Sequence, residues 1–210
     1  MTDVLALSTP HGPARAHCLL RPDAPVALVL GHGAGGSVTA PDLQAVTARV
    51  VEDGGSVVLV EQPYRVAGKR SAPRAPTLDA AWLAVLQTLR AGPLAGVPRL
   101  VCGGRSSGAR VACRTATAVG ADAVLCLAFP LQPPPRRSGP APSRQPELDA
   151  AGVPVLVVQG ESDRFGVPAP DPDRAREVVV VAGDHGLKRD VAGTAAIVAA
   201  WLARTVGPGA

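Results

Sequence analysis

The feature that most constrains the fold of this chain is a series of short, continuously apolar runs separated by longer segments of helical periodicity. These runs span residues 26–30, 56–60, 100–102, 123–128, 153–158 and 177–181. Runs without polar alternation are typical of strands covered on both faces, as in a parallel sheet. Strands that alternate with helices predict an α/β fold.

The segments between the runs carry helical signals. Apolar residues three and four apart, or a series of small residues, predict helices over residues 43–50, 78–89, 106–120 and 187–202. Two weaker β-rich segments, residues 4–7 and 14–20, predict an N-terminal hairpin. Residues 130–146 interrupt the alternation of strands and helices, because they are rich in proline and arginine and show no apolar periodicity. They predict either a solvated loop or a small flap over a site.

Length and composition narrow the class of protein. A chain of 210 residues can bury one substantial core, which predicts a single domain over residues 1–210. The net charge of +4 comes from scattered arginines, and only 2% of residues are aromatic, so no nucleic-acid partner is expected. No basic leader or membrane-length apolar run is present, and a cytoplasmic protein without a membrane association is expected.

The four cysteines are far apart and lie in apolar surroundings. Cys18, Cys102, Cys113 and Cys126 form no C-x-x-C pair and show no ligand spacing with histidine. They are predicted to be buried thiols, without a disulfide framework or a metal site.

The motif with the clearest chemistry is Gly104-Arg105-Ser106-Ser107-Gly108, which follows an apolar run and opens a helix of small residues. The G-x-S-x-G pattern describes a sharp strand-to-helix turn that projects a serine hydroxyl above the sheet. In a chain with 23 glycines the pattern alone carries little weight, but its position between strand and helix predicts Ser106 as a nucleophile.

A nucleophilic serine needs a base and a carboxylate that orients the base. Asp163 follows the run 153–158, and His185 follows the run 177–181. Because parallel strands end at the same edge of a sheet, Ser106, Asp163 and His185 are expected to meet there. Other carboxylates remain open as the acid, namely Glu161, Asp171, Asp173 and Asp184.

The glycine loop Gly31-His32-Gly33-Ala34-Gly35-Gly36 follows the first strand of the predicted parallel sheet. Amides of Ala34 and Ser107 are predicted to bind an oxyanion, since such a hole takes one amide from an early loop and one from the residue after the nucleophile. The loop also fits a dinucleotide-binding G-x-G-x-x-G. Against that alternative, Glu61 lies 30 residues after Gly31, where about 20 is expected for the ribose-binding acid.

The chain resembles the α/β-hydrolase superfamily over nearly its whole length. The resemblance is carried by four segments in this order: the glycine loop, the G-x-S-x-G turn, residues 160–163 and residues 183–185. The chain looks most like small, lid-poor, dienelactone-hydrolase-like proteins and a related group of predicted hydrolases that includes a testis-expressed protein. The resemblance implies a mostly parallel eight-stranded sheet flanked by helices, with a minimal cap. It also implies Ser106 as nucleophile, His185 as general base and Asp163 as orienting carboxylate. Dienelactone hydrolases use cysteine where this chain has Ser106, so lactone specificity is not carried over.

The leading hypothesis is therefore a serine hydrolase that cleaves a small-molecule ester or thioester through an acyl-enzyme and needs no cofactor. A non-catalytic hydrolase-fold binding or scaffold protein is the alternative, and a dinucleotide-binding protein is less favoured. Arg105, Tyr64, Arg65 and Phe165 either border the substrate pocket or pack elsewhere. Acyl size and oligomeric state remain open.

Overall fold

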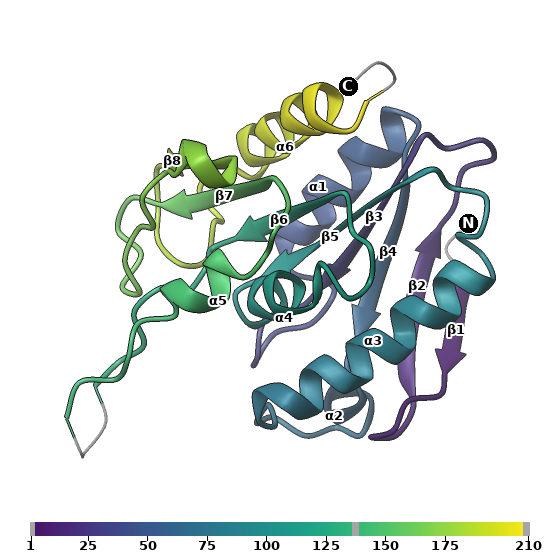
Figure 1. Ribbon diagram of the computed structural model, residues 1–210, viewed down its shortest axis with the longest axis horizontal. Helices are drawn as coiled ribbons and strands as arrows, with labels where there is room; N and C mark the ends of the chain where they lie inside the picture. Colours follow the sequence, from purple (N-terminus) through teal and green to yellow (C-terminus); the bar gives the residue numbers. More distant parts are fainter. Residues whose placement is uncertain (1–2, 136–138, 208–210) are drawn as a thin grey trace.

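The computed structural model describes residues 3–135 and 139–207, and these residues form an eight-stranded sheet flanked by helices (Figure 1). The strands are β1 (Asp3–Leu7), β2 (Ala14–Leu19), β3 (Val26–Gly31), β4 (Ser56–Glu61), β5 (Arg99–Arg105), β6 (Ala123–Leu127), β7 (Val155–Gly160) and β8 (Arg176–Val181). Their order across the sheet is β1-β2-β4-β3-β5-β6-β7-β8. The predicted α/β class is confirmed.

Six of these strands run parallel to one another. β4, β3, β5, β6, β7 and β8 pair in parallel, whereas β2 pairs antiparallel with both β1 and β4. The N-terminal hairpin is therefore present and extends one edge of the parallel sheet. The carboxyl ends of the six parallel strands lie along the same side, where open α/β sheets place their sites.

The helices cover both faces of the sheet. They are α1 (Pro41–Glu52), α2 (Pro63–Val66), α3 (Ala75–Ala91), α4 (Ser107–Thr115), α5 (Gln145–Asp149) and α6 (Val191–Thr205), with a 3₁₀ turn at Pro172–Arg174. Figure 1 shows α1 and α6 on one face, and α3 and α4 on the other. Proline in the first turn of α1, α2, α3 and α5 suits a helix start, where its missing N–H has no intrahelical partner.

Alternate residues of each central strand contribute to two separate cores. Val29 of β3 lies in the cluster that contains Trp82 of α3, whereas Leu30 lies in the cluster that contains Trp201 of α6. Both tryptophans are 1% exposed. A strand buried on both sides has no polar face, which explains why the runs in the sequence are continuously apolar.

The helices differ from the prediction in several places, and the helix after β5 ends at Thr115 and not near residue 120. The last helix begins at Val191 and not near Leu187, because Leu187 has a φ of 47° and the Asp190 carboxylate caps the helix by accepting from the Gly193 amide. The proline-rich segment ends in the short helix α5, which composition did not indicate. Residues 136–138 of that segment, with the arginine pair at 136–137, lie outside the described residues.

The cysteines are buried free thiols, as predicted. Burial raises the pKa of Cys102 to about 12, so its reactive thiolate is strongly disfavoured. The Cys113 and Cys126 sulfurs are 3.4 Å apart, well beyond a disulfide bond length of about 2.0 Å. Across the described residues, no helix combines the length and apolar character needed to cross a bilayer.

Candidate active site

The turn between β5 and α4 holds Ser106 in an unusual backbone conformation. Its φ of 52° and ψ of −104° lie outside the regions that residues with a side chain normally occupy. The Ser106 amide donates to the Leu127 carbonyl at 2.9 Å, which anchors the turn to the end of β6. Strained residues of this kind occur where the surrounding structure over-determines the backbone.

The two glycines of the G-x-S-x-G motif are required by a close approach to β3. A Cβ atom at Gly104 or at Gly108 would lie 2.3 Å from the carbonyl oxygen of Gly31, far inside van der Waals contact. Gly31, the first glycine of the glycine loop, therefore packs directly against the G-x-S-x-G turn. This contact holds the glycine loop and the Ser106 turn side by side at the carboxyl ends of β3 and β5.

The loops after β7 and β8 bring Asp163 and His185 to Ser106. The His185 Nε2 atom lies 2.9 Å from the Ser106 Oγ, and the His185 Nδ1 atom lies 2.7 Å from the Asp163 Oδ2. A carboxylate can only accept, so Nδ1 carries the ring hydrogen and Nε2 is free to accept from the serine hydroxyl. The three residues expected to meet from strand order are thus in hydrogen-bonding contact.

The other carboxylates considered as the acid point elsewhere. Asp184 Oδ1 accepts from the Gly186 amide within its own turn, and Asp171 pairs with Arg174 and Arg176. Glu161 and Asp173 are exposed. Among these carboxylates, Asp163 is the one whose oxygen contacts the His185 ring.

The Asp163 carboxylate is held by two further donors. Its side chain is 0% exposed. The Oδ2 atom accepts from the side-chain Nε2 of Gln159 at 2.7 Å, and the Oδ1 atom accepts from the backbone amide of Phe165 at 2.9 Å. The Phe165 ring packs edge-on against His185, with centroids 4.6 Å apart. Gln159 was not predicted from the sequence. It lies four residues before Asp163, near the end of β7, where a polar residue is common and carries no specific signal.

His32 and Tyr64 fix the glycine loop. The His32 Nδ1–H donates to the Gly33 carbonyl at 2.8 Å, and its Nε2 accepts from the Gln62 amide at 3.1 Å. Burial lowers the pKa of His32, which favours this neutral form. The Tyr64 hydroxyl donates to the Ala34 carbonyl at 2.8 Å.

These bonds determine how the Ala34 amide is oriented. In a trans peptide the carbonyl of one residue and the N–H of the next point in opposite directions, so holding the Gly33 carbonyl turns the Ala34 N–H away from His32. Ala34, Ser106 and Ser107 all line one cavity of about 400 Å³. Within the described residues, neither the Ala34 nor the Ser107 amide has a hydrogen-bond acceptor.

Arg105, the last residue of β5, connects this strand to α1 and to the loop after β8. Its Nε lies 2.9 Å from the Asp42 Oδ2, and its Nη2 donates to the His185 carbonyl at 2.6 Å. The Asp42 side chain is 0% exposed. Burial raises the pKa of the Asp42 carboxyl, against the opposing effect of Arg105. An aspartate in the first turn of a helix is usually a surface dipole partner, so the sequence carried no signal for this buried pair.

We expect Arg105→Met to lower the free energy of unfolding by about 3–5 kcal/mol, because it leaves the Asp42 carboxylate buried without a partner. Urea unfolding of this variant should be compared with Arg49→Met, which breaks the half-exposed Arg49–Asp53 pair and should cost no more than about 1 kcal/mol. Adding Asp42→Leu to Arg105→Met should recover most of the loss. Equal costs for the two single variants would contradict a buried pair.

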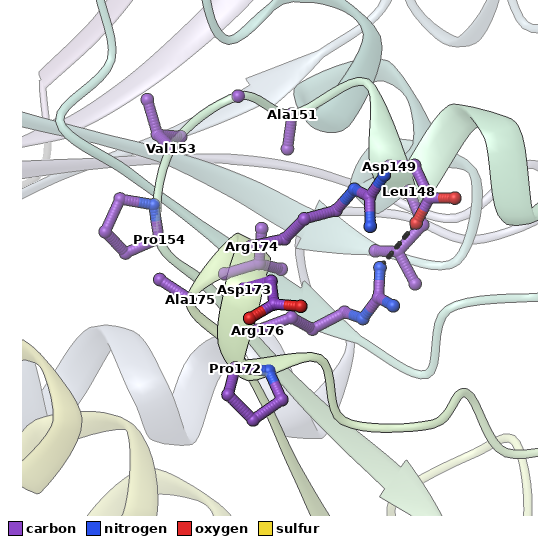
Figure 2. A pocket seen from close by; sticks show the side chains of 12 residues that line it. Leu148, Asp149, Ala151, Val153, Pro154, Pro172, Asp173, Arg174, Ala175 and Arg176 are labelled. Carbon is purple, nitrogen blue, oxygen red and sulfur yellow. Dashed lines mark hydrogen bonds and ion pairs between the residues drawn. The ribbon is translucent and has the colours of Figure 1, made fainter.

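A second cavity, of about 440 Å³, lies at the opposite ends of β7 and β8 (Figure 2). Arg176 there pairs with Asp149 at 2.6 Å. Of the described residues that line it, none is a serine, threonine, cysteine or histidine. Among its described residues this cavity therefore holds a structural ion pair and no hydroxyl, thiol or imidazole group.

The glycine loop departs from a dinucleotide-binding arrangement. α1 begins at Pro41, several residues after Gly36, so the loop does not lead directly into a helix that could cradle a pyrophosphate. Glu61, the residue expected to bind a ribose, contacts His17 at 3.1 Å on the neighbouring strand. The geometry thus favours the role of the loop beside Ser106.

Comparisons with known proteins agree with this architecture. Residues 24–199 match the family described as "Alpha/beta hydrolase domain". No curated protein sequence matches the chain. Among solved structures, an α/β serine hydrolase without a lid from Xanthomonas campestris has 21% identity and a TM-score of 0.75, over 100% of this chain and 97% of that one.

Two further structures have the same TM-score of 0.75 at 14% identity. Est1E from Butyrivibrio proteoclasticus is matched over 98% of this chain and 99% of that one. A dienelactone hydrolase from Anabaena variabilis is matched over 98% of both chains. At these identities the likeness concerns the fold.

Proposed function

Because the chain belongs to the α/β-hydrolase family, we propose that it is a serine hydrolase that cleaves an ester or thioester bond through an acyl-enzyme. The resemblance drawn from the motifs is thereby confirmed at the level of family. The observation that carries the proposal is the continuous contact from Asp163 through His185 to Ser106, at a strained turn that opens into a cavity.

Acylation begins with proton transfer from the Ser106 hydroxyl to the His185 Nε2. The freed Oγ attacks the carbonyl carbon, and the carbonyl oxygen becomes an oxyanion that accepts from the Ala34 and Ser107 amides. The N-terminal end of α4 adds a favourable dipole, since Ser107 is its first residue. As the tetrahedral intermediate collapses, His185 returns the proton to the leaving alcohol or thiol, and the acyl group stays on Ser106.

Deacylation repeats these steps with water. His185 accepts a proton from the water, the resulting hydroxide attacks the acyl carbonyl, and the oxyanion again accepts from the two amides. Collapse of the intermediate breaks the bond to Oγ, which takes the proton back from His185, and the carboxylic acid leaves. Throughout, the Asp163 carboxylate keeps the ring in the required tautomer and stabilises the imidazolium.

Covalent labelling with a fluorophosphonate probe tests this proposal. In an assembled site Ser106 Oγ displaces fluoride and forms a phosphonyl ester, which peptide mass mapping should place on Ser106. The Ser106→Ala variant should remain unlabelled, and Ser107→Ala serves as a matched control whose Ser106 should still react. A folded wild-type protein that takes no label at Ser106 would favour the non-catalytic scaffold alternative.

A further inference from the structure

The cavity at Ser106 has a cationic wall. Three arginines line it, Arg110, Arg114 and Arg144, together with small and apolar residues. Of the described residues that line this cavity, none carries a carboxylate. A neutral acyl chain requires no such wall.

Two carboxylates hold the arginines from outside the cavity. Glu147 of α5 accepts from Arg110 Nε and Nη2 at 2.7 and 2.6 Å and from Arg114 Nη1 at 2.6 Å. Asp79 of α3 accepts from Arg114 Nε and Nη2 at 2.8 and 2.6 Å. Although burial alone would raise it, the pKa of Glu147 is lowered because Arg110 and Arg114 stabilise the charged form.

This bracing leaves hydrogen-bond donors unused. A guanidinium has five N–H donors, of which Arg110 uses two and Arg114 three toward the described residues. Both side chains are already ordered, at 22% and 16% exposed. Binding of a ligand to these two side chains therefore loses less conformational entropy than binding to mobile surface arginines would.

The arginines are within reach of a short substrate. The Arg110 amide donates to the Ser106 carbonyl at 3.2 Å, so Arg110 is one helical turn from the nucleophile and Arg114 is two. These positions are roughly 6 and 12 Å along the helix axis. Arg144 approaches from the segment after β6, where its Nη1 donates to the Pro130 carbonyl at 2.9 Å.

We propose that this cavity binds an anionic group of the substrate, so that the hydrolysed ester or thioester carries a carboxylate or similar anion near the scissile carbonyl. The inference rests on the proposed hydrolase function and adds a substrate class to it. Guanidinium groups bind carboxylates through paired, charge-assisted hydrogen bonds, which a neutral chain of equal length lacks.

Matched ester pairs test the proposal on either side of the scissile bond. On the acyl side, mono-4-nitrophenyl esters of succinic, glutaric and adipic acid are compared with 4-nitrophenyl butanoate, pentanoate and hexanoate. On the leaving-group side, 4-carboxyphenyl pentanoate is compared with 4-carbamoylphenyl pentanoate. The measured quantity is the ratio of kcat/KM for the anionic ester to that for its neutral partner. We expect a ratio of about ten or more in one of the two series, as for a hydrogen bond to a charged group.

Two variants should move this ratio in opposite directions. Arg110→Gln should lower it about tenfold, whereas Glu147→Gln should raise it severalfold because less of the arginine charge is neutralised. In Arg110→Gln the Glu147 carboxylate keeps Arg114 as its partner, so the fold is retained. Arg99→Gln is the matched control: Arg99 is ion-paired with Asp122 at the opposite end of β5, and the ratio should not change.

Binding is measured separately from turnover. Monoethyl glutarate should raise the Tm of the Ser106→Ala variant more than ethyl pentanoate does, and the added Arg110→Gln change should remove the difference. If no ester is hydrolysed but this shift occurs, the proposed function fails and the anionic site stands. Equal ratios for wild type, Arg110→Gln and Glu147→Gln, with no shift in Tm, would overturn the anionic site alone.

Discussion

Replacing Ser106 with alanine is expected to lower kcat/KM for 4-nitrophenyl butanoate by more than about 10⁴-fold. In the proposed mechanism the Ser106 hydroxyl passes its proton to His185, and alanine lacks this hydroxyl. No acyl-enzyme should then form, and the residual rate should come from the oxyanion donors alone. Steady-state kinetics with the purified variant measure the loss.

The Ser106→Ala protein should still fold, because the change removes one oxygen and leaves the backbone of the turn intact. Its thermal unfolding and circular dichroism should match those of wild type. Ser107→Ala, one residue further along, keeps the Ser106 hydroxyl and the amide of residue 107, so it should retain activity within a few fold. Undiminished hydrolysis by a folded Ser106→Ala protein would remove Ser106 from the mechanism.

The second large effect is expected for Asp163→Asn, which should reduce kcat by about 10³–10⁴-fold. Asp163 Oδ2 accepts from both His185 and Gln159, and Oδ1 accepts from the Phe165 amide. An asparagine amide nitrogen at either position faces a donor. Facing His185, it drives the ring toward the tautomer whose Nε2 carries hydrogen and cannot take the serine proton.

Matched amide substitutions separate Asp163 from its neighbours. Asp184→Asn and Glu161→Gln remove one negative charge each from the same two loops without touching the His185 ring. Both should leave kcat within about threefold of wild type, since Asp184 only braces a turn and Glu161 is exposed. A larger loss for Asp184→Asn than for Asp163→Asn would reassign the acid.

Strand order accounts for how much of the site could be predicted. Ser106, Asp163 and His185 each follow an apolar run, and parallel strands necessarily end at one edge, so their meeting required no knowledge of side-chain packing. The glycine loop could be placed for the same reason, because it follows β3, the neighbour of β5.

Contacts that depend on side-chain direction could not be read in this way. Arg105 was expected either to border the pocket or to pack elsewhere, and it packs behind the turn against Asp42 and the His185 carbonyl. The arginines on α4 follow a helical spacing that is equally typical of a solvated face. Their proposed role depends on Asp79, which lies 35 residues from Arg114 in sequence, and on Glu147, which lies 37 residues from Arg110 and 33 from Arg114.

The strained backbone of Ser106 lowers the stability of the fold at the residue whose side chain we propose to be catalytic. A φ of 52° with a ψ of −104° costs of order 1–3 kcal/mol for a residue with a side chain, and glycine would avoid most of that cost. Against a typical net stability of about 5–15 kcal/mol, this is a substantial share for one position. Optimising this sequence for thermal stability alone would therefore favour glycine at position 106, and the most stabilised descendant of the chain would lack the hydroxyl that we propose as its nucleophile.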